Sequence, residues 1–92
     1  MEKLFFRLHA LQRMIEREIS PVRIRQALEK GEVLEDYSSE MPEPGRLVMG
    51  RQHGQPFHVV TSEKPEAGAV TVITVYLPDP DKWKQDGRSR RG

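Results

Sequence analysis

Three side chains that could act on a phosphate group recur at four-residue spacing near the start of the chain: His9, Arg13 and Arg17. On a helix, which turns about 100° per residue, they form a single stripe. A guanidinium binds phosphate oxygens bidentately, and an imidazole transfers protons near neutral pH. The stripe therefore indicates a site for a phosphate-rich ligand, with His9 as a general base and the two arginines as a phosphate clamp.

The same spacing also fits an ordinary solvated helix face. Gln12 and Glu16 are interleaved with the stripe, and ion pairs between residues three or four apart stabilise a helix by about 0.3–0.5 kcal/mol each. A third interpretation makes the stripe structural, with one of the two arginines bridging the helix to Glu35 or Asp36. The three interpretations differ in what the guanidinium groups should contact.

The helix that presents the stripe is expected to run from about residue 9 to residue 19. Its other side should anchor it through four apolar residues: Leu11, Met14, Ile15 and Ile19. Ser20 followed by Pro21 is typical of an N-cap and the first position of a second helix, and Gly31 is suited to end that helix. The two helices must therefore bend sharply against each other.

Beyond Gly31 the apolar residues follow the two-residue period of strands. Strands are expected at 33–37, 46–51, 57–62 and 70–76, and residues 3–8 are either a further short strand or the lead-in to the first helix. A hairpin turn is expected at residues 52–55, with Gly54 supplying a positive φ. Residues 38–45 hold two prolines and a glycine and are expected to form a loop.

These elements predict an α+β domain in which two N-terminal helices pack on one face of a three- to four-stranded antiparallel meander. One globular domain is expected over residues 1–83, with Trp83 packing back on the body. Residues 84–92 form a basic tail without an apolar anchor, so they are expected to be disordered. The other face of the sheet could remain open to a ligand.

Composition and charge narrow the classes of function. The chain has 92 residues, a net charge of +1 and no cysteine, which excludes disulfides, cysteine nucleophiles and cysteine zinc sites. Residues 1–31 carry seven Lys/Arg against four Asp/Glu and residues 82–92 five against one, whereas residues 32–81 carry three against nine. The two basic ends could together form a nucleic-acid footprint. No apolar run approaches the ~20 residues of a membrane span and no signal peptide is evident, so a cytoplasmic protein with no membrane association is expected.

Further polar candidates lie in the strand region. His58 interrupts an apolar strand, and is either a half-buried, hydrogen-bonded residue or part of the open sheet face. Arg46 and Arg51 lie at the two ends of one expected strand, and Tyr76 ends the strongest one. No spacing typical of a metal site or of a Gly-rich phosphate loop occurs, so neither a metal nor another cofactor is expected.

The segment His9-Ala-x-x-Arg-Met-x-x-Arg-x-Ile19-Ser-Pro resembles the signature of a prokaryotic domain family of unknown function. Further matching motifs follow in order: Gly31-Glu-Val-Leu-Glu-Asp-Tyr37, Arg46-Leu-Val-Met-Gly50, Pro56-Phe-His-Val-Val60 and Tyr76-Leu-Pro-Asp-Pro-Asp-Lys-Trp83. The resemblance covers about residues 4–83. That family is similar in layout to the RelE, BrnT and MqsR-like toxin ribonucleases of bacterial toxin–antitoxin pairs, in the barnase–EndoU–colicin–RelE group.

The resemblance implies a RelE- or barnase-like fold, RNA cleavage without a metal, and an antitoxin-like protein partner. In that group the 2′-hydroxyl attacks the adjacent phosphate while a base removes its proton and cations stabilise the phosphorane. The catalytic candidates are His9 or His58 for proton transfer, with Arg13 and Arg46 neutralising the scissile phosphate. The RNA-binding candidates are Arg17, Arg51 and Tyr76. The competing hypothesis is a non-catalytic module whose basic stripe docks nucleic acid or protein.

Overall fold

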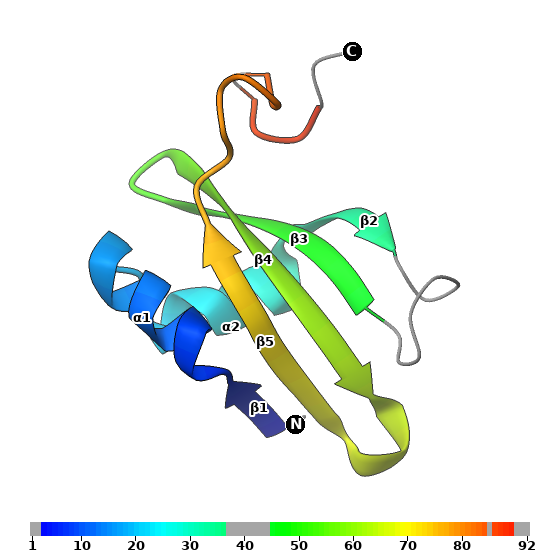
Figure 1. Cartoon of the computed structure of the whole chain (residues 1–92). Coiled ribbons are helices and arrows are strands. Elements are labelled where there is room, and N and C mark those ends of the chain that lie inside the picture. The colour runs from blue at the N-terminus through cyan, green and yellow to red at the C-terminus, as the bar shows by residue number, and fades with distance from the viewer. Residues whose placement is uncertain (1–2, 37–44, 85, 90–92) are drawn as a thin grey trace.

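The computed structural model describes residues 3–36, 45–84 and 86–89 (Figure 1). Along the chain the elements are β1 (Lys3–Phe6), α1 (Leu8–Arg17), α2 (Pro21–Lys30), β2 (Glu32–Asp36), β3 (Gly45–Gln52), β4 (Gln55–Lys64), a short 3-10 helix (Pro65–Ala67) and β5 (Ala69–Tyr76). Both expected helices and all four expected strands are present. The loop expected at residues 38–45 lies outside the described residues except for Gly45, which begins β3. Among the described residues, no helix has the length and apolar character needed to cross a membrane.

The five strands form one mixed sheet in the order β1-β5-β4-β3-β2. Strands β2 to β5 pair antiparallel with their neighbours. β1, in contrast, pairs in parallel with β5, with Lys3 opposite Ala69 and Phe6 opposite Val72. The prediction of three to four antiparallel strands is therefore corrected to five strands with one parallel pair, because residues 3–6 extend the sheet at the edge of β5.

Local sequence determines two sharp turns, the β3–β4 hairpin turn and the bend between α1 and α2. His53 and Gly54 take positive φ values of 51° and 78°, as a two-residue hairpin turn requires, so that β3 leads directly into β4. The α1–α2 bend begins at Glu18, which is left-handed with φ of 55°. It ends at Ser20, whose hydroxyl accepts the Arg23 amide at 3.2 Å and caps α2.

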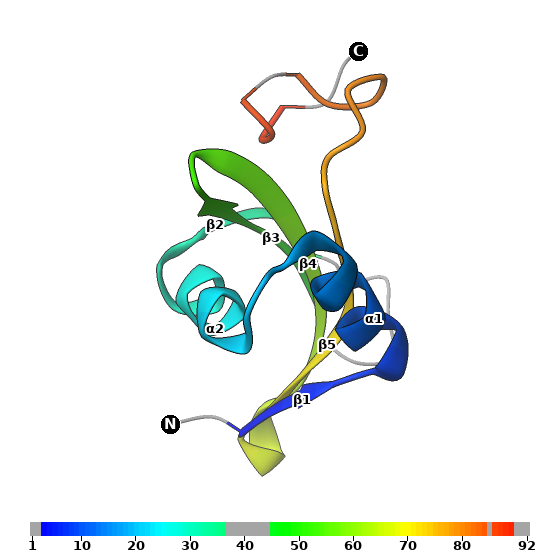
Figure 2. The same ribbon diagram turned by 90° about the vertical axis from the view of Figure 1, so that its left-hand side faces the viewer.

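Both helices lie on one face of the sheet (Figure 2) and cover its apolar core. The buried core residues are Ala10, Met14, Ile19, Ile24, Ala27, Phe57, Val59, Val72 and Val75. The contact made by α1 is narrower than the sequence predicts: Ile15 is 77% exposed and Leu11 is 37% exposed. Because Ala10 and Met14 face the sheet, Ile15 points outward, and no described element covers it.

The segment after β5, here called the C-terminal strap (residues 78–84 and 86–89), lies at the hairpin end of the sheet (Figure 1). There Gly87 approaches His58 and Pro56. Trp83 is buried there, as expected, with its ring 4.5 Å from that of His58. Gly87 is also buried against the sheet. Of the basic tail expected at residues 84–92, the described residues 86–89 make backbone and ionic contacts with β3, β4 and β2.

Candidate active site

The three residues of the stripe line one cavity of about 280 Å³ beside the free edge of β5. This β5-edge cavity is bordered by His9, Arg13, Arg17, Thr74, Tyr76 and Leu77. The structure therefore brings together four of the residues that the sequence singles out. It adds Thr74, which sequence reasoning missed because a threonine in a β-branched strand is explained by strand propensity alone.

The cavity exists because β1 is short. Its pairing with β5 ends at Phe6 opposite Val72, and the Arg7 amide then donates to the Val72 carbonyl at 3.0 Å. The chain turns into α1 at Leu8, so the helix and not a strand borders β5 beyond this point. An unpaired strand edge presents amide and carbonyl groups, and here it faces the basic side of α1.

His9 is tied directly to the sheet. Its Nε2 lies 3.1 Å from the Thr74 hydroxyl, although the two residues are 65 positions apart in sequence. In one of the two neutral tautomers, Nε2–H donates to the threonine oxygen and leaves Nδ1 able to accept a proton. The contact holds the ring at the border of the cavity, and in this tautomer Nδ1 is available for general-base chemistry.

The two guanidinium groups are only loosely engaged. Arg13 lies 3.4 Å from Glu16 in a solvent-exposed ion pair, a kind of pair that contributes at most about 1 kcal/mol. Arg17 makes no ion pair within the described residues. A bridge from either arginine to Glu35 or Asp36 does not fit, because those residues lie on β2, at the opposite edge of the sheet from α1 and β5.

His58 lies elsewhere, fully buried on the sheet face that carries the strap. Its Nε2 is 2.6 Å from the Gly87 carbonyl, and its ring packs edge-on against Trp83 and Tyr76. Of the two sequence alternatives, the hydrogen-bonded packing residue describes it better than a residue of an open face. Tyr76 connects the two regions, since it contacts His58 and also borders the β5-edge cavity.

The two strand arginines are also apart from the cavity. Arg46 lies 3.6 Å from Glu63, at the end of β3 remote from the hairpin. The five-residue distance to Arg51 corresponds to about 17 Å along the strand. Arg51 donates to the carbonyls of Gly54 and Asp86, at 3.3 Å each. The structure therefore does not gather Arg46, Arg51 or His58 with the stripe, and in the described ranges no group of three His, Asp or Glu side chains could hold a metal ion.

Comparison with known proteins gives one match. A family model described as a domain of unknown function (DUF4258) matches residues 6–77. No curated protein and no solved structure matches the chain. The matched span contains every residue of the β5-edge cavity and stops before the C-terminal strap.

Proposed function

The chain belongs to the DUF4258 family of domains of unknown function, and we propose that it is a metal-independent endoribonuclease that cuts single-stranded RNA in the β5-edge cavity. The observation that carries the proposal is the His9–Thr74 contact, which fixes a base beside two guanidiniums at an open strand edge. A helix face that is only solvated does not require a contact between its histidine and the sheet.

The proposed reaction is an internal transfer of the phosphoryl group. His9 Nδ1 removes the proton of the 2′-hydroxyl, and O2′ attacks the adjacent phosphorus. The bond from phosphorus to the 5′ oxygen breaks, leaving a 2′,3′-cyclic phosphate and a 5′-hydroxyl whose proton comes from water in the open cavity. In the tautomer that this step uses, the Thr74 hydroxyl accepts from Nε2–H and positions the ring, and general-base catalysis of this kind contributes about 10²–10⁴-fold.

Charge stabilisation falls to the arginines. Arg13 is weakly paired and Arg17 is free of ion pairs in the described part of the chain, so both guanidiniums can turn to the phosphate oxygens. Fixed cations at the position where charge develops are often the largest catalytic contribution, about 10²–10³-fold for one donor. Tyr76, at the border of the cavity, orients the RNA. His58 and Arg46 have no role in this scheme.

We also propose that the protein is toxin-like, related in fold to the RelE and barnase group, that it acts in the cytoplasm, and that an antitoxin-like protein binds it. The support for a partner is the apolar flank of α1, the side away from the β5-edge cavity. Leu8 and Ile15 are 71% and 77% exposed there, and Val22 of α2 is 65% exposed. Clusters of exposed apolar side chains of this kind are typical of protein interfaces.

The test expresses the chain in bacteria without any neighbouring partner gene, and in parallel incubates the purified protein with RNA in the presence of EDTA. The wild type should slow growth and produce 2′,3′-cyclic ends, and a 2′-deoxy substitution at the scissile position should block cutting. The His9→Ala/Arg13→Ala variant should neither slow growth nor cut RNA. Arg46→Gln is the matched control, since it removes a charge outside the cavity and should behave as the wild type.

Each outcome has a definite meaning once circular dichroism shows that the variants fold. A wild-type protein that neither slows growth nor cuts RNA overturns the ribonuclease proposal. If the wild type binds RNA with a steep salt dependence but leaves it intact, the non-catalytic binding module is the better description. Loss of cutting in Arg46→Gln, with His9→Ala/Arg13→Ala still active, would place the site at the other end of β3.

A further inference from the structure

A second basic cavity lies at the hairpin end of the sheet, as the β5-edge cavity does, but at the opposite edge. This β3-edge cavity of about 320 Å³ is bordered by four cations and one acid: Arg23, Lys30, Arg51, Arg88 and Glu32. It forms where β2 leaves β3, because their pairing begins at Glu32 opposite Met49. Strand β3 therefore has an unpaired edge from Gly50 to the hairpin, as β5 has beyond Val72.

The positive charge of the β3-edge cavity is not balanced by the residues around it. Glu32 pairs with Arg88 at 3.0 Å, while Arg23 and Lys30 have no ion pair in the described ranges. The C-terminus of α2 contributes a negative dipole equivalent to about half a charge. With that contribution and the Asp86 carboxylate, which interacts with Arg88, the excess among the described residues is still more than one positive charge, which an anionic ligand would offset.

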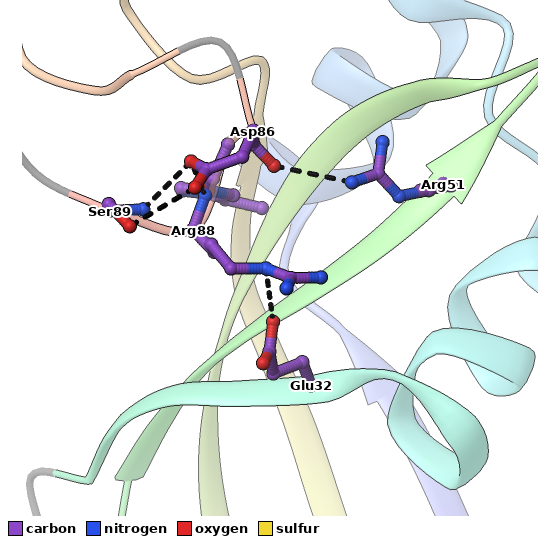
Figure 3. A network of polar contacts seen from close by, with 7 residues as sticks. Glu32, Arg51, Asp86, Arg88 and Ser89 are labelled. Carbon is purple, nitrogen blue, oxygen red and sulfur yellow. Dashed lines mark hydrogen bonds and ion pairs between the residues drawn. The ribbon is translucent and has the colours of Figure 1, made fainter.

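The strap holds one of the four cations, Arg51, and supplies another, Arg88 (Figure 3). Arg51 donates to the Asp86 carbonyl, a neutral acceptor that leaves its charge uncompensated. The Asp86 carboxylate in turn accepts the amides of Arg88 and Ser89, at 2.9 and 3.1 Å, which shapes the turn that sends Arg88 back towards β2. Preorganised cations lose less freedom on binding a phosphate than mobile ones do.

A third cavity, the hairpin cavity of about 290 Å³, lies between the end of α1 and the β3–β4 turn and adjoins the β5-edge cavity. Arg17 and Leu77 border both the β5-edge cavity and the hairpin cavity. On the other side, Gln52 of the hairpin cavity is adjacent in sequence to Arg51 of the β3-edge cavity. Among the described residues no acidic side chain borders the hairpin cavity, and two strand spacings, about 10 Å, separate β5 from β3.

We infer that the β3-edge cavity is a phosphate-binding subsite for the same RNA strand, so that a single strand runs from the cleavage position over the hairpin to Arg23 and Lys30. The inference rests on the proposed function for the identity of the strand. It makes the protein selective for an extended single-stranded substrate, since a dinucleotide occupies the β5-edge cavity alone. A phosphate at the far subsite contributes binding and no chemistry.

The test measures binding and cleavage separately. A dinucleotide and a dodecamer RNA carrying 2′-O-methyl groups, which cannot be cut, report affinity as a function of salt, and the unmodified forms report cleavage. Arg23→Gln/Lys30→Gln should lose the extra affinity for the dodecamer, with the slope of log affinity against log salt falling by roughly 1.4. Its affinity for the dinucleotide and its cleavage of the dinucleotide should be unchanged.

The matched control is Lys3→Gln/Arg25→Gln, which removes the same charge from a different cavity, between α2 and β1. Equal loss in both double variants, or no length dependence in the wild type, overturns the subsite and leaves the ribonuclease proposal standing. Length-dependent binding that requires Arg23 and Lys30 without any cleavage supports the subsite and overturns the ribonuclease. If a polyglutamate peptide binds through these residues and RNA does not, the inference is wrong and the cavity serves an acidic protein.

Discussion

The two edge cavities share a structural origin and differ in the groups that they contain. In each, an edge strand stops before its neighbour does and a helix borders the exposed strand edge. The β5-edge cavity holds an imidazole fixed by a hydroxyl, with two loosely engaged guanidiniums. The β3-edge cavity holds four cations and no described group that transfers protons near neutral pH.

This difference separates the proposed chemistry from the proposed affinity. Only a site that combines a proton acceptor with cations can both activate a hydroxyl and stabilise the charge that develops. Cations remote from the reacting phosphate increase binding of substrate and transition state equally, which lowers KM without raising kcat. The family match covers the whole β5-edge cavity and, of the β3-edge cavity, every described border residue except Arg88.

The largest expected effect is a reciprocal change in two kinetic constants. His9→Ala should lower kcat for a long RNA by about 10²–10⁴-fold with little change in KM, because it removes the base and no phosphate contact. Arg23→Gln/Lys30→Gln should raise KM with kcat preserved. Steady-state kinetics on one dodecamer substrate measure both, and a similar kcat loss in the two variants would show that the cavities do not divide the roles.

Removal of the strap's aromatic anchor should come next. Trp83→Ala deletes a buried ring that packs on His58, and truncations of this size destabilise a protein by about 3 kcal/mol. Urea denaturation followed by circular dichroism measures the loss. Arg88 should also lose its fixed position, so the affinity gained with RNA length should shrink while dinucleotide cleavage persists; Trp83→Phe should restore most of both. An unchanged unfolding free energy would mean that the ring contributes no packing.

Local sequence patterns predict much of the fold and, in the candidate site, the stripe of α1. Ser20 followed by Pro21 placed the start of α2, and Gly54 placed the hairpin turn, because each depends on a few adjacent residues. The stripe of α1 was likewise predicted by its spacing, and the structure places it along one cavity.

Features that depend on distant contacts were not predictable in this way. The parallel pairing of β1 joins residues more than sixty positions apart, and a four-residue segment carries too little pattern to specify it. Ile15 looks like an anchor on a helical wheel, yet the rotation of α1 is set by Ala10 and Met14. The sequence around His58 fits a binding site and a packed residue equally well, because its burial depends on the strap, whose Gly87 lies 29 positions away.

A smaller effect tests whether Thr74 positions His9. Thr74→Val keeps the shape of the side chain and removes the hydroxyl. The activation free energy should therefore rise, and kcat fall, by the contribution of one exposed hydrogen bond, at most about 1.5 kcal/mol. KM and the unfolding midpoint should hardly change. Thr74→Ser should restore kcat, and a Thr74→Val protein with wild-type kcat would show that the contact does not position the base.

The acids beside the two cavities offer a still smaller, matched comparison. Glu16 pairs with Arg13 at the β5 edge, and Glu32 pairs with Arg88 at the β3 edge. Both pairs are exposed, so Glu16→Gln and Glu32→Gln should each change stability by less than about 1 kcal/mol. Glu16→Gln should improve dinucleotide cleavage, whereas Glu32→Gln should steepen the salt dependence of dodecamer binding by roughly 0.7. If both variants alter dinucleotide cleavage alike, the two edges do not act independently.

The smallest effect concerns the acid that shapes the strap. Hydrogen bonds from the Arg88 and Ser89 amides lower the pKa of Asp86 below its ordinary value of 3.8. A lowered folded-state pKa means that this contribution to stability is complete above pH 3.8 and is lost as the pH falls through the lowered value.

Trp83, the single tryptophan, reports loosening of the strap through its fluorescence. The wild type should therefore show a step in emission below pH 3.8 that Asp86→Asn lacks, since asparagine keeps an acceptor oxygen and does not titrate. Cleavage of a dinucleotide, measured after return to neutral pH, should be the same in both proteins, because the β5-edge cavity does not depend on this turn. A step that persists in Asp86→Asn would assign the low-pH loosening to other carboxylates and remove Asp86 from the support of the β3-edge cavity.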